Sequence, residues 1–460
     1  MKKSIALFNA TLVAMSATPL LGAALASTLT DPETSKAMLD KQNEHFIQRV
    51  VQVAPNVYTG VGFHGANTSM IVGDDGVIII DTLMGPESAA NAMKAFRQFT
   101  DKPVKAIIYT HSHGDHTGGA SAFMAEAIPN AVIGKDIDLI GHVGMGGGHG
   151  SDSSIDTIAA KRDLRQFGRK LPLEDQTNRG LAPAKTIDHD RGTGYIPANI
   201  RIDADYKTTI AGVDLELIPA AGETNDAIFI WLPKEKVLFT GDNFYQAFPN
   251  LYAIRGTPYR DVRVWAKSVA KMASYKPQAV VPGHTTPIMG EQESVEALQS
   301  YSDAIQYVFD ATVQGMNQGL DPVTIAQSIE LPSHYADKPY LTQFYGTIEG
   351  ASRAIYSGLM GWFDGNPVNL NPLSHTSNAR KMAQLAGGSD KLLESFNEAM
   401  EGGEYQWALV LAESLLLLED VDAKVVREAQ IVALRAMAAM EYNAPKRNYY
   451  LTYARELEAQ

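Results

Sequence analysis

The sequence contains no cysteine among its 460 residues. Disulfide bonds, thiolate metal ligands and cysteine nucleophiles are therefore excluded together. Because the remaining strong metal-binding side chains are those of histidine, aspartate and glutamate, any metal ion in this protein must be bound by those residues.

The sequence also lacks clusters of basic side chains. It has 39 lysine and arginine residues against 52 aspartate and glutamate residues, so its formal net charge is −13. Phosphate backbones are bound by concentrated positive charge, which excludes nucleic acid as a partner. An anionic substrate would need a local basic pocket. The hydrophobic share of 45% is typical of a globular protein, and the length predicts two or three domains.

A long apolar run occurs at the amino terminus. Residues 1–26 begin with two lysines after Met1, continue through mostly apolar residues and end in small residues at Ala26. This order of regions predicts a secretory signal peptide, and the alternative is an uncleaved membrane anchor. Because no twin-arginine pair is present, we expect export by the general route and a periplasmic location.

Strand and helix patterns alternate between about residues 50 and 300. Residues 67–81 read as a hairpin that leads to the carboxylate of Asp81. Residues 86–99 are expected to form a helix and residues 104–109 a short apolar strand. Later elements are expected at residues 213–218, 227–232, 237–240, 261–274 and 279–281. The alternation predicts a layered α/β domain.

Two regions depart from this alternation. Residues 130–200 have little periodicity and many glycines, so we expect insertions and loops around a site. Their glycine run lacks the lysine and hydroxyl residue of a phosphate loop, which argues against a nucleotide site. The final part of the chain has amphipathic helical patterns at residues 389–402, 404–418, 422–442 and 445–459. They predict a separate all-α domain whose apolar faces form its own core or a dimer interface.

The expected strand at residues 104–109 runs into a loop that is dense in metal ligands. His111, His113, Asp115 and His116 lie within six residues. On a turn after a strand, the first two can face one metal ion while the other two reach a second. A chance cluster is disfavoured because such ionisable groups would repel one another or lose hydration unless a metal ion organised them.

Two metal ions need further ligands, and the sequence offers three candidates where strands are expected to end. They are Glu223 in Ala-Gly-Glu-Thr-Asn-Asp, Asp242 in Phe-Thr-Gly-Asp-Asn and His284 in Val-Pro-Gly-His. Each residue alone would be weak support, because a lone acidic residue after a strand is usually a cap. Their order after the histidine-rich loop makes them a set.

This series of motifs resembles the metallo-β-lactamase superfamily over about residues 50–300. The resemblance implies an αββα sandwich with a dinuclear, usually zinc, site. In most of that superfamily a histidine stands where this chain has Glu223. The substitution points to a narrower resemblance, to alkylsulfatases that hydrolyse long-chain sulfate esters such as dodecyl sulfate.

Three further segments resemble the alkylsulfatases. Residues 250–256, with Arg260 and Asp261, are similar to the segment that holds sulfate, and Gln166-Phe167-Gly168 is similar to an upstream signature. Residues 361–367 resemble the start of the dimerisation domain of that family. The resemblance therefore implies a homodimer assembled through the carboxyl-terminal helices.

The family resemblance also implies roles for individual residues. His111, His113 and Glu223 would bind one zinc ion, Asp115, His116 and His284 would bind the other, and Asp242 would bridge them. Asp115 and Asp242 are accordingly the expected catalytic residues. Two adjacent cations can lower the pKa of a shared water and stabilise negative charge on a leaving group. Other divalent transition metals suit the same ligands.

Substrate contacts are expected from Arg255, Asn250 and Tyr195. Arg255 can grip a sulfate group through planar, charge-assisted hydrogen bonds, with Asn250 beside it. The alternative for Arg255 is a surface ion pair. Tyr195 would supply a third oxygen contact, and the alternative is that it packs without touching substrate.

The chain departs from the alkylsulfatase pattern at several places, among them the His284 motif Pro-Gly-His-Thr-Thr-Pro and two positions near the expected site. The bridging position, commonly glutamate in those enzymes, is Asp242 here. The histidine that usually follows a Tyr-Gly pair is absent, since Glu349 and Gly350 follow Tyr345-Gly346. One expected anion contact is then missing. These departures keep open a second interpretation, a hydrolase of the same superfamily acting on a lactone, β-lactam, thioester or phosphate ester.

We therefore expect an αββα metallo-β-lactamase sandwich followed by an all-α domain. The expected boundaries are 1–26 for the signal peptide, 27–310 for the catalytic domain and 311–460 for the helical dimerisation-type domain. The expected enzyme is a dinuclear zinc hydrolase that converts alkyl sulfate esters to alcohol and inorganic sulfate with metal-activated water. Its expected partners are the small sulfate ester and a second copy of the chain, without stable membrane insertion after cleavage. A non-enzymatic anion- or metal-binding protein is disfavoured because both ligand sets are complete.

Overall fold

The computed structural model describes residues 27–146, 153–187 and 189–460. The predicted signal peptide, residues 1–26, lies outside the described residues. Within the described ranges, no helix combines the length and the apolar character that crossing a membrane requires.

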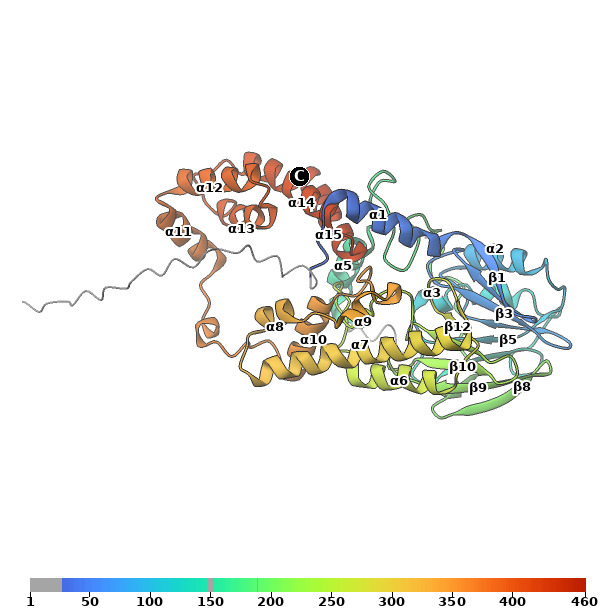
Figure 1. Ribbon diagram of the computed structural model, residues 1–460. Helices are drawn as coiled ribbons and strands as arrows, with labels where there is room; N and C mark the ends of the chain where they lie inside the picture. Colours follow the sequence, from blue (N-terminus) through green and yellow to red (C-terminus); the bar gives the residue numbers. More distant parts are fainter. Residues whose placement is uncertain (1–26, 147–152, 188) are drawn as a thin grey trace, which may run out of the picture.

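Two β-sheets form the centre of the molecule (Figure 1). The first runs in the order β1-β2-β3-β4-β5-β6-β7 and the second in the order β13-β12-β11-β10-β9-β8. Neighbours from β4 to β7 pair in parallel, as do β11 and β12, and the other neighbouring pairs are antiparallel. The strands are β1 (Arg49–Ala54), β2 (Val57–Val61), β3 (Thr68–Val72), β4 (Val77–Ile80), β5 (Val104–Ile108), β6 (Asp138–His142), β7 (Ile200–Ile202), β8 (Tyr206–Ile210), β9 (Val213–Pro219), β10 (Ile228–Leu232), β11 (Val237–Gly241), β12 (Ala279–Pro282) and β13 (Ile288–Met289).

Central strands are apolar on both faces because they lie between two cores. In β4, Ile78 and Ile80 pack in the core between the sheets, while Val77 and Ile79 pack in the core on the outer face. Alternation along a strand sends successive side chains to opposite faces. Burying an aliphatic side chain fully stabilises the fold by about 1.5–3 kcal/mol. Strands that are buried on both faces therefore appear in the sequence as uninterrupted apolar runs.

Helices cover the outer face of each sheet. Phe96 of α2 and Phe123 of α4 pack on the first sheet, whereas Trp265 of α6 and Tyr301 of α7 pack on the second. This arrangement confirms the predicted αββα sandwich. The helices of this part of the chain are α1 (Pro32–Gln42), α2 (Pro86–Phe96), α3 (Gly114–Thr117), α4 (Ala120–Met124), α5 (Asp156–Phe167), α6 (Val262–Ser274) and α7 (Glu291–Asn317).

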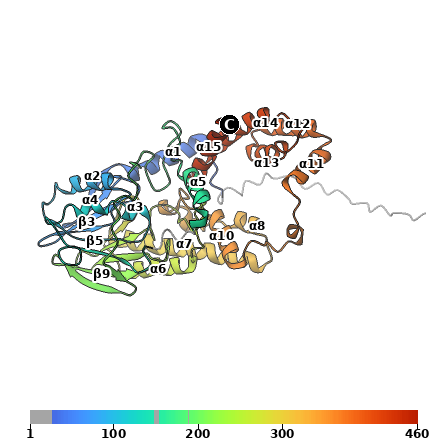
Figure 2. The same cartoon turned by 180° about the vertical axis from the view of Figure 1, so that it is seen from behind.

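The carboxyl-terminal region is helical, as predicted. Its helices are α8 (Pro322–Ser328), α9 (Ser333–Ala336), α10 (Ile348–Met360), α11 (His375–Ala386), α12 (Ser389–Glu401), α13 (Tyr405–Leu415), α14 (Ala423–Met440) and α15 (Ala444–Glu458). Helices α11 to α13 project from the body and share a small core around Phe396 and Leu411. Helix α15 returns to the body and lies against α5, as both Figure 1 and Figure 2 show.

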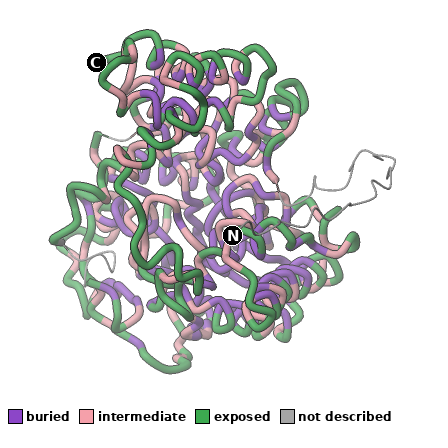
Figure 3. The backbone as a smooth tube through the Cα atoms, turned by 90° about the vertical axis from the view of Figure 1, so that its left-hand side faces the viewer, coloured by how far each residue is buried: buried purple, intermediate pink, exposed green. Residues whose placement is uncertain are grey.

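The two predicted domains share a continuous helix. Helix α7 passes through residue 310 without a break, and Ile325 and Ile355 of the following region pack in the core beneath α6 and α7. In Figure 3, buried segments run through the interior while exposed residues occupy the outer loops and turns. The domain boundary at residue 310 stays a prediction.

Residues 130–200 contain more regular structure than the sequence indicated. They include β6 as well as α5. Gln166 is the only fully buried residue of α5, so the helix has few of the buried apolar side chains by which a helix is recognised in a sequence. Strand β6 is short and follows a loop, which leaves little pattern to detect.

Gly118 provides a test of the packing between α3 and the loop after β4. A Cβ atom at this glycine would lie 1.9 Å from the carbonyl oxygen of Met84, so we expect Gly118→Ala to destabilise the protein by about 1–3 kcal/mol or more. Thermal unfolding measures the change. The control is Gly402→Ala, whose Cβ would approach no atom closer than 3.2 Å; equal melting temperatures for the two variants would contradict the expected clash.

Candidate metal centre

The predicted ligands come from loops at one edge of the two sheets. His111 and His113 follow β5, and Asp115 and His116 lie in the short helix α3. Glu223 lies in the turn between β9 and β10. Asp242 follows β11 and His284 follows β12, and these two strands pair in parallel. The two sheets are joined at this edge by a hydrogen bond of 2.8 Å from the Ile228 N–H to the Thr110 carbonyl oxygen.

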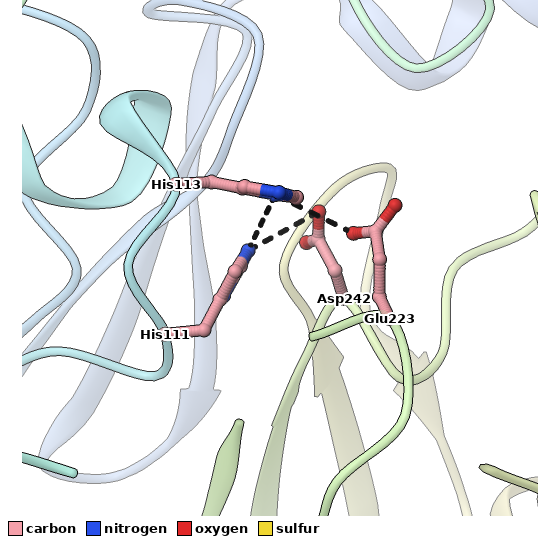
Figure 4. Close-up of side chains that lie close together, drawn as sticks. All are labelled: His111, His113, Glu223 and Asp242. Carbon is pink, nitrogen blue, oxygen red and sulfur yellow. Dashed lines mark hydrogen bonds and ion pairs between the residues drawn. The ribbon is translucent and has the colours of Figure 1, made fainter. Parts of the chain in front are cut away.

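The structure brings all seven predicted ligands together in two groups. Within each group, one ligand atom of each residue lies within 4.8 Å of the others. Figure 4 shows the first group, in which side chains from two sheets point toward one another. The first group consists of His111, His113, Glu223 and Asp242, and the second of Asp115, His116 and His284.

Asp242 lies between the two groups. Its Oδ1 is 3.3 Å from His116 Nε2, and its Oδ2 is 3.2 Å from His284 Nε2 and 3.8 Å from His111 Nε2. One carboxylate therefore faces histidines of both groups. This is the arrangement that a bridging ligand requires.

Three buried polar atoms at the centre have no hydrogen-bond partner among the described residues. They are His116 Nε2, Glu223 Oε2 and Asp242 Oδ1. Leaving buried polar atoms unsatisfied costs free energy. Because the three converge with other nitrogen and oxygen donors, the residues present fit a pair of divalent cations.

Without a cation, the centre shows strong pKa shifts in opposite directions. Burial lowers the pKa of His116, but the carboxylates of Asp242 and Asp81 outweigh burial and hold it well above its usual range. Burial raises the pKa of Asp242, but His284 and His116 outweigh that and hold it well below its usual range. Burial raises the pKa of Glu223 to about 8, although Arg260 opposes the shift. A metal ion would compete with protons for these ligand atoms, so metal binding would release protons.

Asp81 orients one of the histidines. It accepts hydrogen bonds from the Thr110 N–H and hydroxyl, both at 2.8 Å, and lies 2.7 Å from His116 Nδ1. This contact occupies Nδ1 and leaves Nε2 to face the centre. The sequence pattern placed a carboxylate here but assigned it no role. Further outer contacts of this kind join His284 Nδ1 to the carbonyl oxygens of Gly65 and Leu181, and His111 Nδ1 to the Thr110 hydroxyl.

Arg260 was not predicted to take part in the metal centre. Its Nη1 donates to Glu223 Oε1 at 2.9 Å and to the Asn250 carbonyl oxygen at 2.5 Å. Both side chains of the pair are about 5% exposed or less. Arg260 therefore balances the extra negative charge of Glu223. The other carboxylate oxygen of Glu223, Oε2, faces the centre and lies 3.7 Å from His113 Nδ1.

The predicted substrate residues lie in different surroundings. Asn250 is buried, and its N–H donates to the Tyr245 hydroxyl. Arg255 is half-buried, and no carboxylate of the described residues forms an ion pair with it. Tyr195 is 37% exposed, and its ring lies 6.0 Å from that of Tyr109. Substrate contact by these residues stays a prediction.

The outer carboxylate supplies a test of the centre. We expect Asp81→Asn to weaken binding of the second metal ion by about 10–100-fold, because the amide cannot accept all the hydrogen bonds that fix His116. Metal content and competitive chelator titration measure the change. Asp75→Asn, an exposed carboxylate in the same hairpin, is the control. Equal metal affinity in both variants would rule out the orienting role.

Comparisons with known proteins agree with this geometry. Residues 61–284 match the metallo-beta-lactamase superfamily, and residues 321–460 match the alkyl sulfatase dimerisation family. The linear primary-alkylsulfatase of Pseudomonas sp. (strain ATCC 19151) is 34% identical over 397 residues, which cover 85% of this chain and 73% of that protein. The (R)-specific secondary-alkylsulfatase of Pseudomonas sp is 31% identical, with 89% of this chain and 63% of that protein covered.

A solved structure is similar over almost the whole chain. It is the stereoselective inverting sec-alkylsulfatase Pisa1 from Pseudomonas sp., with a TM-score of 0.81, 29% identity, and coverage of 92% of this chain and 67% of that one. The chain thus spans 63% to 73% of the length of these three relatives. Given the fold, the ligand groups and these matches, the chain belongs to the alkylsulfatase branch of the metallo-beta-lactamase superfamily and is an alkylsulfatase-like metallohydrolase.

Proposed function

We propose that this protein is a dinuclear zinc hydrolase that cleaves alkyl sulfate esters to an alcohol and inorganic sulfate. The observation that carries the proposal is the Glu223–Arg260 pair, which joins the first ligand group to the loop that carries Asn250 and Arg255. Arg260 thereby ties one metal ligand to the loop that carries a cationic side chain suited to a sulfate group. Similarity to proteins named alkylsulfatases supports the same substrate class.

In this proposal, each metal ion has its own ligands and Asp242 is shared. His111, His113 and Glu223 bind one ion, and Asp115, His116 and His284 bind the other. When bound, two zinc ions would supply Lewis-acid stabilisation of negative charge and a water molecule acidic enough to be a nucleophile near neutral pH.

Two carboxylates of the centre, those of Asp115 and Asp242, act in their ionised form. Burial raises the pKa of Asp115, but His116 and His284 outweigh burial and lower it overall. Asp242 is held in the same direction by the same two histidines. Because both carboxylates stay ionised at neutral pH, they serve as ligands and hydrogen-bond acceptors rather than as proton donors.

In this proposal, the loop after β11 orients the substrate. The guanidinium of Arg255 offers planar donors that match two oxygens of a sulfate group. It keeps this capacity because no neighbouring carboxylate pairs with it among the described residues. Asn250 is fixed beside it by the Tyr245 hydroxyl and by Arg260, and Tyr195 would add a further oxygen contact.

The decisive experiment measures sulfate release from dodecyl sulfate by the chain from Ser27 onward, loaded with zinc. We expect zinc-dependent release that falls by roughly 100-fold or more in His113→Ala, since losing a ligand exceeds the 10–100-fold cost of losing an outer partner. Ion chromatography quantifies the product. Two bound zinc ions with no release from dodecyl or shorter alkyl sulfates would refute the proposal.

A second candidate is a hydrolase of the same superfamily that acts on a lactone, β-lactam, thioester or phosphate ester. It is favoured by the position of Glu349, whose carboxylate pairs with Arg353 at 2.8 Å and with Lys446 at 3.3 Å. Nothing in that segment replaces the histidine contact that the alkylsulfatase pattern implies. Turnover of a lactone or phosphodiester panel, without alkyl sulfate turnover, would establish this candidate.

We further propose that the chain forms a homodimer through the projecting helices. The match to the dimerisation family covers them. Leu385 of α11 is 90% exposed, and the segment from the end of α10 to α11 exposes Met360 (65%), Trp362 (78%) and Val368 (75%). Such side chains gain free energy when a partner covers them. Export to the periplasm belongs to the same proposal and rests on residues 1–26.

Leu385→Glu should weaken this dimer. A charge placed in an apolar interface is expected to raise the dissociation constant at least about 30-fold, the cost of losing an interface hot spot of about 2 kcal/mol. Sedimentation velocity over a range of concentrations reports the change. Val132→Glu, which alters an apolar residue that is 53% exposed and lies elsewhere, is the control; identical association in both variants would contradict an interface on α11.

A further inference from the structure

We infer that the segment Gln166-Phe167-Gly168 at the end of α5 is the support that positions Arg255, and that α15 holds this support in place. The inference deepens the proposed function, because it assumes that Arg255 binds the sulfate group. It assigns Gln166 and Phe167 as positioning residues for an anionic substrate.

The backbone of the arginine loop is held from α5 by two hydrogen bonds. The N–H of Arg255 donates to Gln166 Oε1 at 2.8 Å, and Arg162 Nη2 donates to the Ile254 carbonyl oxygen at 2.6 Å. Gln166 is fully buried. These hydrogen bonds join residues that are 89 and 92 positions apart in the sequence.

The side chain of Arg255 also meets α5. Its guanidinium carbon lies 5.8 Å from the centre of the Phe167 ring, within the range of a cation–π contact. An aromatic face attracts the guanidinium without occupying the N–H donors in its plane. Phe167 can therefore restrict where Arg255 lies while leaving those donors for an anion, which a carboxylate partner would not do.

Gly168 brings the end of α5 close to α15. It adopts a left-handed conformation with φ of 58°, and a Cβ atom there would lie 2.7 Å from Leu171 Cδ1 and 3.1 Å from Asn448 Cγ. A larger residue would force α5 away from α15. A glycine is thus required at this position both by the left-handed backbone conformation and by the close approach of α5 to α15.

Helix α15 binds α5 through a cluster of polar and aromatic contacts. Arg165 donates to the carboxylate of Glu456 from Nε at 3.0 Å and from Nη2. The same guanidinium lies 4.9 Å from the Tyr453 ring centre and 5.5 Å from that of Tyr449. Figures 1 and 2 both show the two helices crossing beside the body. Contacts therefore run without interruption from α15 through α5 to Arg255.

The first test compares Phe167→Leu, Gln166→Met and Phe167→Tyr in the zinc-loaded full chain. The first variant keeps an apolar side chain without a ring, the second keeps length without an acceptor, and the third keeps the ring. We expect the first two to raise both the KM for dodecyl sulfate and the inhibition constant for inorganic sulfate by about 10-fold. Zinc content and kcat should change far less, and Phe167→Tyr should stay near wild type.

A structural role alone would give a different result. Variants that lower the melting temperature but leave KM and the inhibition constant unchanged would overturn the inference. Binding of inorganic sulfate, measured by calorimetry, separates this outcome from failure of the proposed function. If the wild-type protein binds sulfate but hydrolyses no sulfate ester, the proposed function is wrong. The inference is then tested by whether Phe167→Leu weakens sulfate binding. A wild type with no measurable sulfate binding would overturn the inference as well.

The second test addresses α15. Glu456→Ala removes the partner of Arg165, whereas Glu458→Ala removes a carboxylate of the same helix that pairs with Arg435 and Arg455. We expect Glu456→Ala to raise the inhibition constant for sulfate by roughly 3-fold and Glu458→Ala to leave it unchanged. Equal effects of the two substitutions would show that the contact between Glu456 and Arg165 does not help to position Arg255.

Discussion

The burial of four histidines and three carboxylates at one edge of two packed sheets is the constraint on which the rest of the structure depends. Charged groups with little access to water are stable only when other charges or hydrogen bonds compensate them. The opposite pKa shifts of His116 and Asp242 show how protons are redistributed to meet this requirement. Two cations meet it better, because they satisfy several donor atoms at once.

The Glu223–Arg260 pair extends this balance beyond the ligands. A glutamate in place of a neutral histidine adds one negative charge, and the buried guanidinium of Arg260 compensates it. The same guanidinium also binds the Asn250 carbonyl oxygen. A first-group metal ligand and the proposed sulfate loop are therefore fixed by one side chain.

The parts of the site that could be predicted from sequence are those encoded within a few neighbouring residues. The four ligands at 111–116 are almost contiguous, and Asp242 and His284 each follow a short apolar strand. Arg260 could not be found in this way, because its function depends on a residue 37 positions away. Helix α5 was missed for a related reason: its one fully buried residue, Gln166, is polar and contacts a residue 89 positions away.

The position of α5 connects the carboxyl-terminal helices to the catalytic part, because α15 packs against it. A guanidinium on a loop is held less accurately than one on a helix or strand, so Arg255 requires support from α5. Helix α5 buries no large apolar side chain fully, and α15 contacts it through Glu456 and two tyrosines. The exposed apolar residues at 360–385 lie on a different part of the same region. One helical region can therefore support the substrate loop with polar contacts while it offers an apolar surface to a second chain.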